Sequence, residues 1–135
     1  MGRLRSIAFV YMLILLAAAS LNYVPGLTDA EGRAFGIFAL DIYDDGLHVA
    51  SALWAGTAAA VSSRAARLFL LYFGLLYLSD GLLGLAAGSG YLDLGIVNHG
   101  VLDLPPSFKI LANLPHISGG GFAIFSSVRF ANEAR

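Results

Sequence analysis

Asp80, His48 and His116 are the residues whose types and positions best suit chemistry in this chain. Asp80 lies within a long apolar stretch. A charged carboxylate at the centre of a bilayer costs about 2.5–3.5 kcal/mol on insertion scales, so Asp80 is expected to face other helices and to be neutral or paired. It would either bind a proton or a cation, or lock the helices together by a hydrogen bond to Ser20, Ser51 or a histidine.

The two histidines each follow a capping residue at the same spacing. His48 comes three residues after Asp45, and His116 comes three residues after Asn113. Asp and Asn are good helix N-caps, so Asp45 and Asn113 are predicted to cap two helices, with each histidine in the first turn. Two histidines at equal depth on facing helices could ligate one haem iron.

Other functions of the histidines remain open. With Asp45 or Asp80 they could bind a metal or transfer a proton, or each could simply be hydrogen-bonded within its own helix turn. The sequence has no cysteine and lacks the spacing of a calcium loop, a dinucleotide fingerprint or a nucleophile elbow. No metal site and no enzymatic activity are therefore predicted.

The composition indicates a membrane protein. Hydrophobic residues make up 58% of the 135 residues and charged residues only 13%. A soluble domain is about half apolar and about a quarter charged, and a chain this short cannot bury the excess. The formal net charge of −1 argues against nucleic acid as a partner.

Four apolar stretches predict one integral membrane domain over residues 1–135. The expected spans are residues 7–24, 46–61, 68–87 and 114–128. We interpret the first stretch as an uncleaved helix, because it is longer than the apolar part of a signal peptide. The apolar segments 35–40 and 108–112, before the two shorter spans, are expected to lie at the membrane interface or to re-enter the membrane.

The arginines predict the orientation. Most basic residues fall on one side of the four spans, where they are Arg3, Arg5, Arg64, Arg67, Arg129 and Arg135. Lys and Arg accumulate in cytoplasmic loops, so both termini are expected in the cytoplasm.

Each histidine begins a stripe of small residues. At four, seven and eleven residues after the histidine, the first stripe has Ala52, Ala55 and Ala59, and the second has Gly120, Ala123 and Ser127. Such stripes let membrane helices pack closely. The pattern predicts a four-helix bundle built from two pseudo-repeated helical hairpins.

The chain resembles an uncharacterised bacterial four-helix membrane family known as domain of unknown function 4383. The resemblance runs from about Gly36 to Gly120 and rests on Gly36-Ile37-Phe38, Asp45-x-x-His48, Ser63-Arg64-Ala65-Ala66-Arg67, Phe73-Gly74-Leu75-Leu76-Tyr77-Leu78, Leu82-Leu83-Gly84, Leu94-Gly95-Ile96-Val97-Asn98 and Asn113-x-x-His116. It implies the fold, the paired Asp/Asn-x-x-His sequences and the bacterial inner membrane, but no activity. Residues 101–109 look like an insertion, and Asp80 matches no family position.

These features favour a non-catalytic membrane protein, either an accessory or assembly subunit of a larger complex or a homo-oligomer. Its partners would be the lipid bilayer and other membrane proteins or itself. The alternatives are a proton- or ion-handling protein that uses Asp80 with His48 or His116, and a haem-binding electron carrier that uses both histidines.

Overall fold

The computed structural model describes residues 1–135 and is helical throughout. The order of elements is α1 (Arg3–Ser20), η1 (Leu21–Tyr23), α2 (Ile42–Val61), α3 (Ser63–Ala87), α4 (Gly95–His99), α5 (Pro106–Arg129) and η2 (Ala131–Ala134), where η marks a 3₁₀ helix. The only β features are two isolated bridges in the α1–α2 loop.

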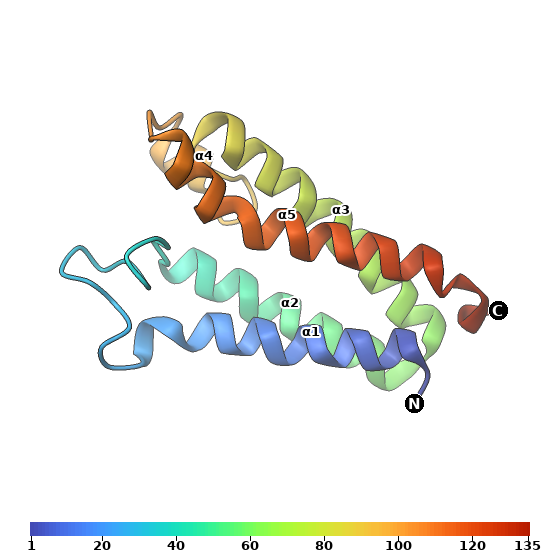
Figure 1. Ribbon diagram of the computed structural model, residues 1–135. Helices are drawn as coiled ribbons and strands as arrows, with labels where there is room; N and C mark the ends of the chain where they lie inside the picture. Colours follow the sequence, from blue (N-terminus) through green and yellow to red (C-terminus); the bar gives the residue numbers. More distant parts are fainter.

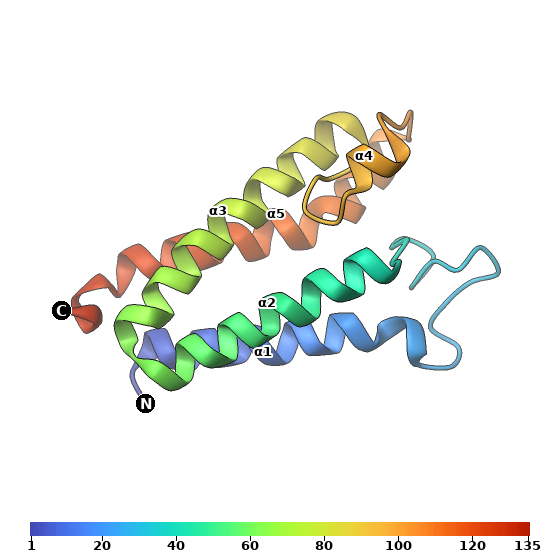
Figure 2. The same ribbon diagram turned by 180° about the vertical axis from the view of Figure 1, so that it is seen from behind.

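The four long helices form two antiparallel hairpins. One hairpin pairs α1 with α2 and the other pairs α3 with α5, and these are the most extensive helix contacts in the molecule (Figures 1 and 2). Both termini and the tight turn between α2 and α3 lie at one end, here called the terminal end (Figure 1). The hairpins diverge toward the opposite end, here called the loop end, where the α1–α2 loop and α4 lie (Figure 2).

Aromatic residues of α3 fill the space between the hairpins. The rings of Phe69 and Phe73 lie 5.1 Å apart, and those of Phe73 and Tyr77 stack at 4.0 Å. From the first hairpin, Tyr11 packs edge-on against Phe73 at 5.2 Å and Trp54 packs against Phe69 at 5.0 Å. This column occupies the core between the loop end and the terminal end.

The small residues predicted to mediate helix packing face the core. All members of both stripes are buried: Ala52, Ala55, Ala59, Gly120, Ala123 and Ser127. Between α3 and α5 the approach is close enough that a Cβ built on Gly120 would lie 2.5 Å from the backbone nitrogen of Leu78. The second hairpin therefore depends on glycine at its helix crossing.

Two helices are long and apolar enough to cross a membrane: α1 extended through Tyr23, and α3. Helices α2 and α5 are also long, with 20 and 24 residues, but they carry more polar residues. The polar residues concerned are Asp44, Asp45, His48, Lys109, Asn113 and His116. The helical architecture is thus established, while spanning by all four helices remains a prediction.

The predicted caps Asp45 and Asn113 are wrong, because both helices begin earlier. The N-cap of α2 is Asp41, whose Oδ1 accepts from the amides of Tyr43 and Asp44 at 2.8 and 3.1 Å. The Asp44 carboxylate accepts in return from the Asp41 amide at 3.2 Å, which completes a capping box. This reciprocal pair satisfies the first-turn amides and leaves Asp45 inside the helix.

Helix α5 begins at Pro106, with Pro105 as its N-cap. Proline suits the first helical position, because its missing N–H would have had no partner there. Asn113 therefore lies within the helix, and its side-chain amide donates to the Lys109 carbonyl at 2.8 Å. The expected interfacial segment 108–112 is part of α5, and Pro115 lies inside the same helix.

Candidate functional site

A cavity of about 380 Å³ lies between the two hairpins at the loop end. Its lining includes ionisable side chains from both hairpins and from the loops, namely Asp41, Asp44, His48, Asp80, Asp93, His99, Lys109 and His116. Most of its surface is apolar, and Phe38, Leu40, Leu102 and Phe108 contribute to it. A volume of this size is within the range of small-molecule sites.

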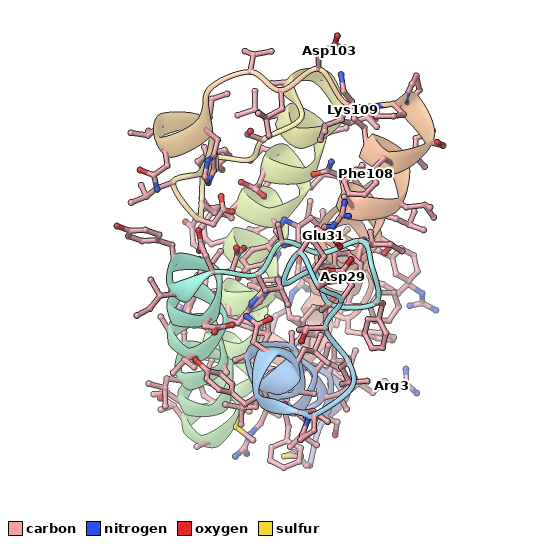
Figure 3. All side chains as sticks on the ribbon, turned by 90° about the vertical axis from the view of Figure 1, so that its left-hand side faces the viewer. Arg3, Asp29, Glu31, Asp103, Phe108 and Lys109 are labelled. Carbon is pink, nitrogen blue, oxygen red and sulfur yellow. The ribbon has the colours of Figure 1, made fainter.

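The α1–α2 loop partly covers this end. Figure 3 views the bundle from the loop end and shows Asp29 and Glu31 of that loop in front of the helices, with Phe108 and Lys109 of α5 beside them. The guanidinium carbon of Arg33 lies 6.0 Å from the centroid of the Phe108 ring, which is within cation–π range. The loop of the first hairpin thus reaches across to α5 of the second.

Asp80 lies at the floor of the cavity and joins three segments. Only 3% of its surface is exposed. Its Oδ1 accepts from the backbone amides of Tyr91 and Leu92 at 2.6 and 2.8 Å, and its Oδ2 lies 2.7 Å from Nδ1 of His116. These contacts hold the α3–α4 loop and α5 to α3.

Two glycines make the contacts of Asp80 possible. Gly88 ends α3 with φ of +80°, a left-handed conformation that turns the chain back on the helix. A Cβ on Gly90 would lie 2.6 Å from Oδ1 of Asp80, so only glycine lets the carboxylate approach the returning backbone. The α3–α4 loop is therefore shaped to donate hydrogen bonds to Asp80.

His116 connects Asp80 to the aromatic column. Its ring packs edge-on against Tyr77 with centroids 4.9 Å apart, and the Tyr77 hydroxyl lies 2.8 Å from the Ser51 hydroxyl of α2. With Asp80 ionised, Nδ1 of His116 carries the proton that is donated to the carboxylate, and this fixes the tautomer of the ring. The contact of Tyr77 with Ser51 thus links the second hairpin, which contains both Asp80 and His116, to the first.

His48 comes from the first hairpin and faces His116. The two ring centroids are 6.4 Å apart, with the rings at 71° to one another. His48 is only 8% exposed, and its buried Nδ1 has no hydrogen-bond partner. The Asp44 carbonyl, one turn earlier, lies nearby but outside hydrogen-bond geometry. His48 thus lines the cavity with an unused polar atom.

Two carboxyl groups meet at the side of the cavity, Asp44 of α2 and Asp93 of the α3–α4 loop. Burial, reinforced by the negative charge of Asp93, raises the pKa of Asp44 to about 8. Asp44 is therefore largely protonated at pH 7, and Asp93 is close enough to accept its hydrogen bond. The two acids thus face one another across the gap between the hairpins.

The structure brings together the three residues that the sequence singled out for chemistry. Of the partners left open for Asp80, it selects a histidine, His116. Ser51 is bonded to Tyr77 instead, and Ser20 to the Ala17 carbonyl. Asp45 does not reach the histidines by any hydrogen bond and accepts from the Tyr23 hydroxyl at 3.1 Å.

Sequence reasoning missed the part played by Asp44 and Asp93. A signal for Asp44 existed, since Asp41 and Asp44 have the three-residue spacing of a capping box, which turns Asp44 back toward the helix start. No local signal indicates Asp93, because only the folding of the α3–α4 loop brings it to α2. His99 at the end of α4 is exposed and also lines the cavity.

The arrangement suits proton binding better than metal or nucleophilic chemistry. No three side chains among His, Asp and Glu lie where they could share a metal ion. No hydroxyl group is hydrogen-bonded to either histidine, as a nucleophilic triad would require. The predicted haem site at His48 and His116 stays a prediction. The Asp80 carboxylate and the His116 imidazole, by contrast, form a hydrogen-bonded pair of the kind that can take up and give off one proton.

No protein-family model, curated protein or solved structure matches this chain. Membership of the family of domain of unknown function 4383 therefore stays a prediction.

Proposed function

We propose that this chain is a non-catalytic membrane protein of four spans that handles protons at the Asp80–His116 pair. The four spans are supported by the outer surface of the bundle, because every long helix exposes large apolar side chains. Examples are Val10, Ile14, Leu53, Val61, Leu75, Leu82, Phe122 and Phe125. Exposed apolar surface on every side exceeds what a soluble monomer carries.

The polar residues of α2 and α5 are compatible with helices that span a membrane, because these residues face the cavity or lie in the first turns of the helices. Asp44, Asp45 and His48 are buried, and His116 is bonded to Asp80. Ionisable groups inside membrane proteins face the bundle or a water-filled cavity and mark proton or ion pathways. The same residues that lower the hydropathy of these helices therefore form the site.

The single observation that carries the proton-handling function is the contact of 2.7 Å between the buried Asp80 carboxylate and the His116 imidazole. Asp80 lies seven residues before the end of α3, which is about 10 Å of helix. It faces a cavity at the loop end, while Phe69, Phe73 and Tyr77 fill the core toward the terminal end. The proton site is thus open to one side only.

The two hairpins provide a way for this access to change. They contribute one histidine each, pack together toward the terminal end, and diverge at the loop end (Figure 1). Rocking of two repeats around a site at their interface is the usual mechanism of alternating access. A proton taken up at His116 would be released to the other side when the hairpins change their relative tilt.

Replacing Asp80 by asparagine is expected to abolish proton flux. Asparagine keeps an oxygen for the Tyr91 and Leu92 amides but carries no negative charge, so the carboxylate–imidazole pair with His116 is lost. The measurement is proton flux into liposomes containing the purified protein, with a pH-sensitive dye inside. We expect at least a tenfold decrease, with helix content unchanged by circular dichroism.

The matched control for this flux measurement is Asp103→Asn, which removes a carboxylate from the exposed α4–α5 loop. This variant should retain the flux of the unmodified protein. Two results would contradict the proposal. One is equal proton flux for the Asp80→Asn variant and the unmodified protein, and the other is flux through the unmodified protein no greater than that of empty liposomes.

A role as an accessory subunit or homo-oligomer is the second candidate, and a surface groove favours it. The groove lies between α1 and α5 and is lined by Val10, Tyr11, Ile14, Gly119 and Phe122. A Cβ on Gly119 would meet nothing within 4 Å, so the α5 surface is open there. Small residues at such a position let a further helix approach closely.

Native mass measurement after extraction in a mild detergent tests this second candidate. A stable dimer, or a constant partner, is expected if a helix fills the groove, and Gly119→Leu should then release the monomer. A mass equal to one chain under the mildest extraction would rule this role out. The visible spectrum of the same sample tests the haem alternative, which requires a Soret band.

A further inference from the structure

We infer that the cavity at the loop end binds a small organic cation, an amine with an apolar body, whose ammonium group lies between Asp44 and Asp93. This inference rests on the proposed function only in using the same cavity. Such an amine is the molecule that would exchange for a proton in this cavity.

The charge of the lining favours a cation. Four carboxyl groups line the cavity, from Asp41, Asp44, Asp80 and Asp93, against one lysine, Lys109. Asp80 is already satisfied by two amides and His116, and Asp41 caps α2. Asp44 accepts only from the Asp41 amide and Asp93 only from the Gly95 amide, so each of these two carboxyl groups keeps one oxygen without a partner. A bound ammonium group would replace the proton of Asp44 and donate to both carboxylates.

The unpartnered imidazole provides an independent indication of a ligand. His48 is more than nine-tenths buried, lines the cavity one turn along α2 from Asp44, and leaves Nδ1 without a partner. A buried polar atom without a hydrogen bond is costly, and a ligand that donates to it would remove that cost. A metal ion is a poor candidate, because no three ligating side chains converge.

The apolar part of the lining favours an organic cation over a hydrated inorganic one. Phe38, Leu40, Leu102 and Phe108 line the space, and most of its surface is apolar. The volume of about 380 Å³ accommodates a ring or short chain beside the ammonium group. An alkylamine remains protonated up to a pKa near that of lysine, about 10.4, and so enters as a cation.

Competition with the proton gives a measurable signature. Asp44 is surrounded by Asp41 and His48 on its own element, Tyr77 of α3 and Asp93 of the loop, with His99 and Lys109 farther round the cavity. Because the pKa of Asp44 is raised to about 8, a bound cation must displace its proton below that pH. Binding should release close to one proton at pH 6.5, and affinity should rise about tenfold from pH 6 to pH 7.

The experiment uses cyclohexylamine as the probe and cyclohexanol as its uncharged counterpart. Binding to the full chain in lipid nanodiscs is measured by titration calorimetry in two buffers of different ionisation enthalpy, with empty nanodiscs subtracted. We expect cyclohexylamine to bind with proton release and cyclohexanol to bind at least tenfold more weakly. Equal binding of the two probes, or none of the amine, would overturn the inference.

Asp44→Asn is the decisive variant, because asparagine keeps the oxygen that accepts from the Asp41 amide in the capping box. It should weaken amine binding at least tenfold at pH 8.5 and abolish both the proton release and the dependence of affinity on pH. Asp103→Asn, with its exposed loop carboxylate, is the matched control and should bind as the unmodified protein does. A pH dependence that persists in Asp44→Asn would overturn the inference.

If Asp44→Asn does not fold, Asp93→Asn replaces it, with the same expected loss of amine affinity. The proposed proton-handling function and the inferred amine site can be disproved independently. Asp80→Asn should abolish proton flux but keep amine binding within about threefold, because Asp44 and Asp93 are unchanged in it. Amine binding without flux would contradict only the proposed function, and flux without amine binding would contradict only this inference.

Discussion

Replacing Asp80 by alanine is expected to lower the free energy of unfolding by about 3–5 kcal/mol, because a donor left without an acceptor costs about 1–3 kcal/mol. The change leaves three donors without an acceptor: the amides of Tyr91 and Leu92, and Nδ1 of His116. We therefore expect the α3–α4 loop to detach from α3 and the loop end to become mobile before the rest of the bundle unfolds.

Two measurements check this result. Equilibrium unfolding in mixed micelles gives the free energy, and hydrogen exchange of the Tyr91 and Leu92 amides reports the loop directly. Asp103→Ala is the control and should stay within about 0.5 kcal/mol, because that side chain is exposed and makes no side-chain hydrogen bond. If Asp80→Ala leaves both amides protected, the loop is held by something other than this carboxylate.

Replacing Gly120 by alanine should destabilise the crossing of α3 and α5 by about 1–3 kcal/mol, as overpacking does in other close contacts. The new Cβ would lie 2.5 Å from the backbone nitrogen of Leu78 and 2.9 Å from the Gly74 carbonyl oxygen. Backbone atoms cannot rotate away as a side chain can. The two helices must therefore separate, which also shifts His116, one turn earlier on α5, relative to Asp80.

Gly121→Ala is the matched control for the Gly120 substitution. A Cβ at Gly121 would meet nothing within 4 Å, so this change only adds the helix propensity of alanine, up to about 1 kcal/mol of stabilisation. The free energy of unfolding in mixed micelles should thus fall for Gly120→Ala and rise for Gly121→Ala, although the two residues are adjacent. Equal effects of the two substitutions would show that α3 and α5 do not cross as closely as described.

The helical elements could be predicted because their determinants are local. Long apolar stretches mark the helices, and the period of small residues after His48 and His116 marks the sides on which they pack. The residues at which the helices begin are harder to predict from the sequence. Asp45 and Asn113 are good capping residues by type, yet Asp41 forms the capping box with Asp44, and Pro106 begins α5 earlier. Several residues near each start could cap, and neighbours decide which one does.

The sequence by itself determined that Asp80 needs a partner inside the bundle, because a lone carboxylate is too costly in an apolar setting. Only the tertiary structure decided that the partners are His116 and two loop amides, because the turn at Gly88 and the missing Cβ of Gly90 bring distant residues to it. It also decided that Asp44 and Asp93 line the same cavity. These contacts join segments far apart in the chain, and no periodicity encodes their distance.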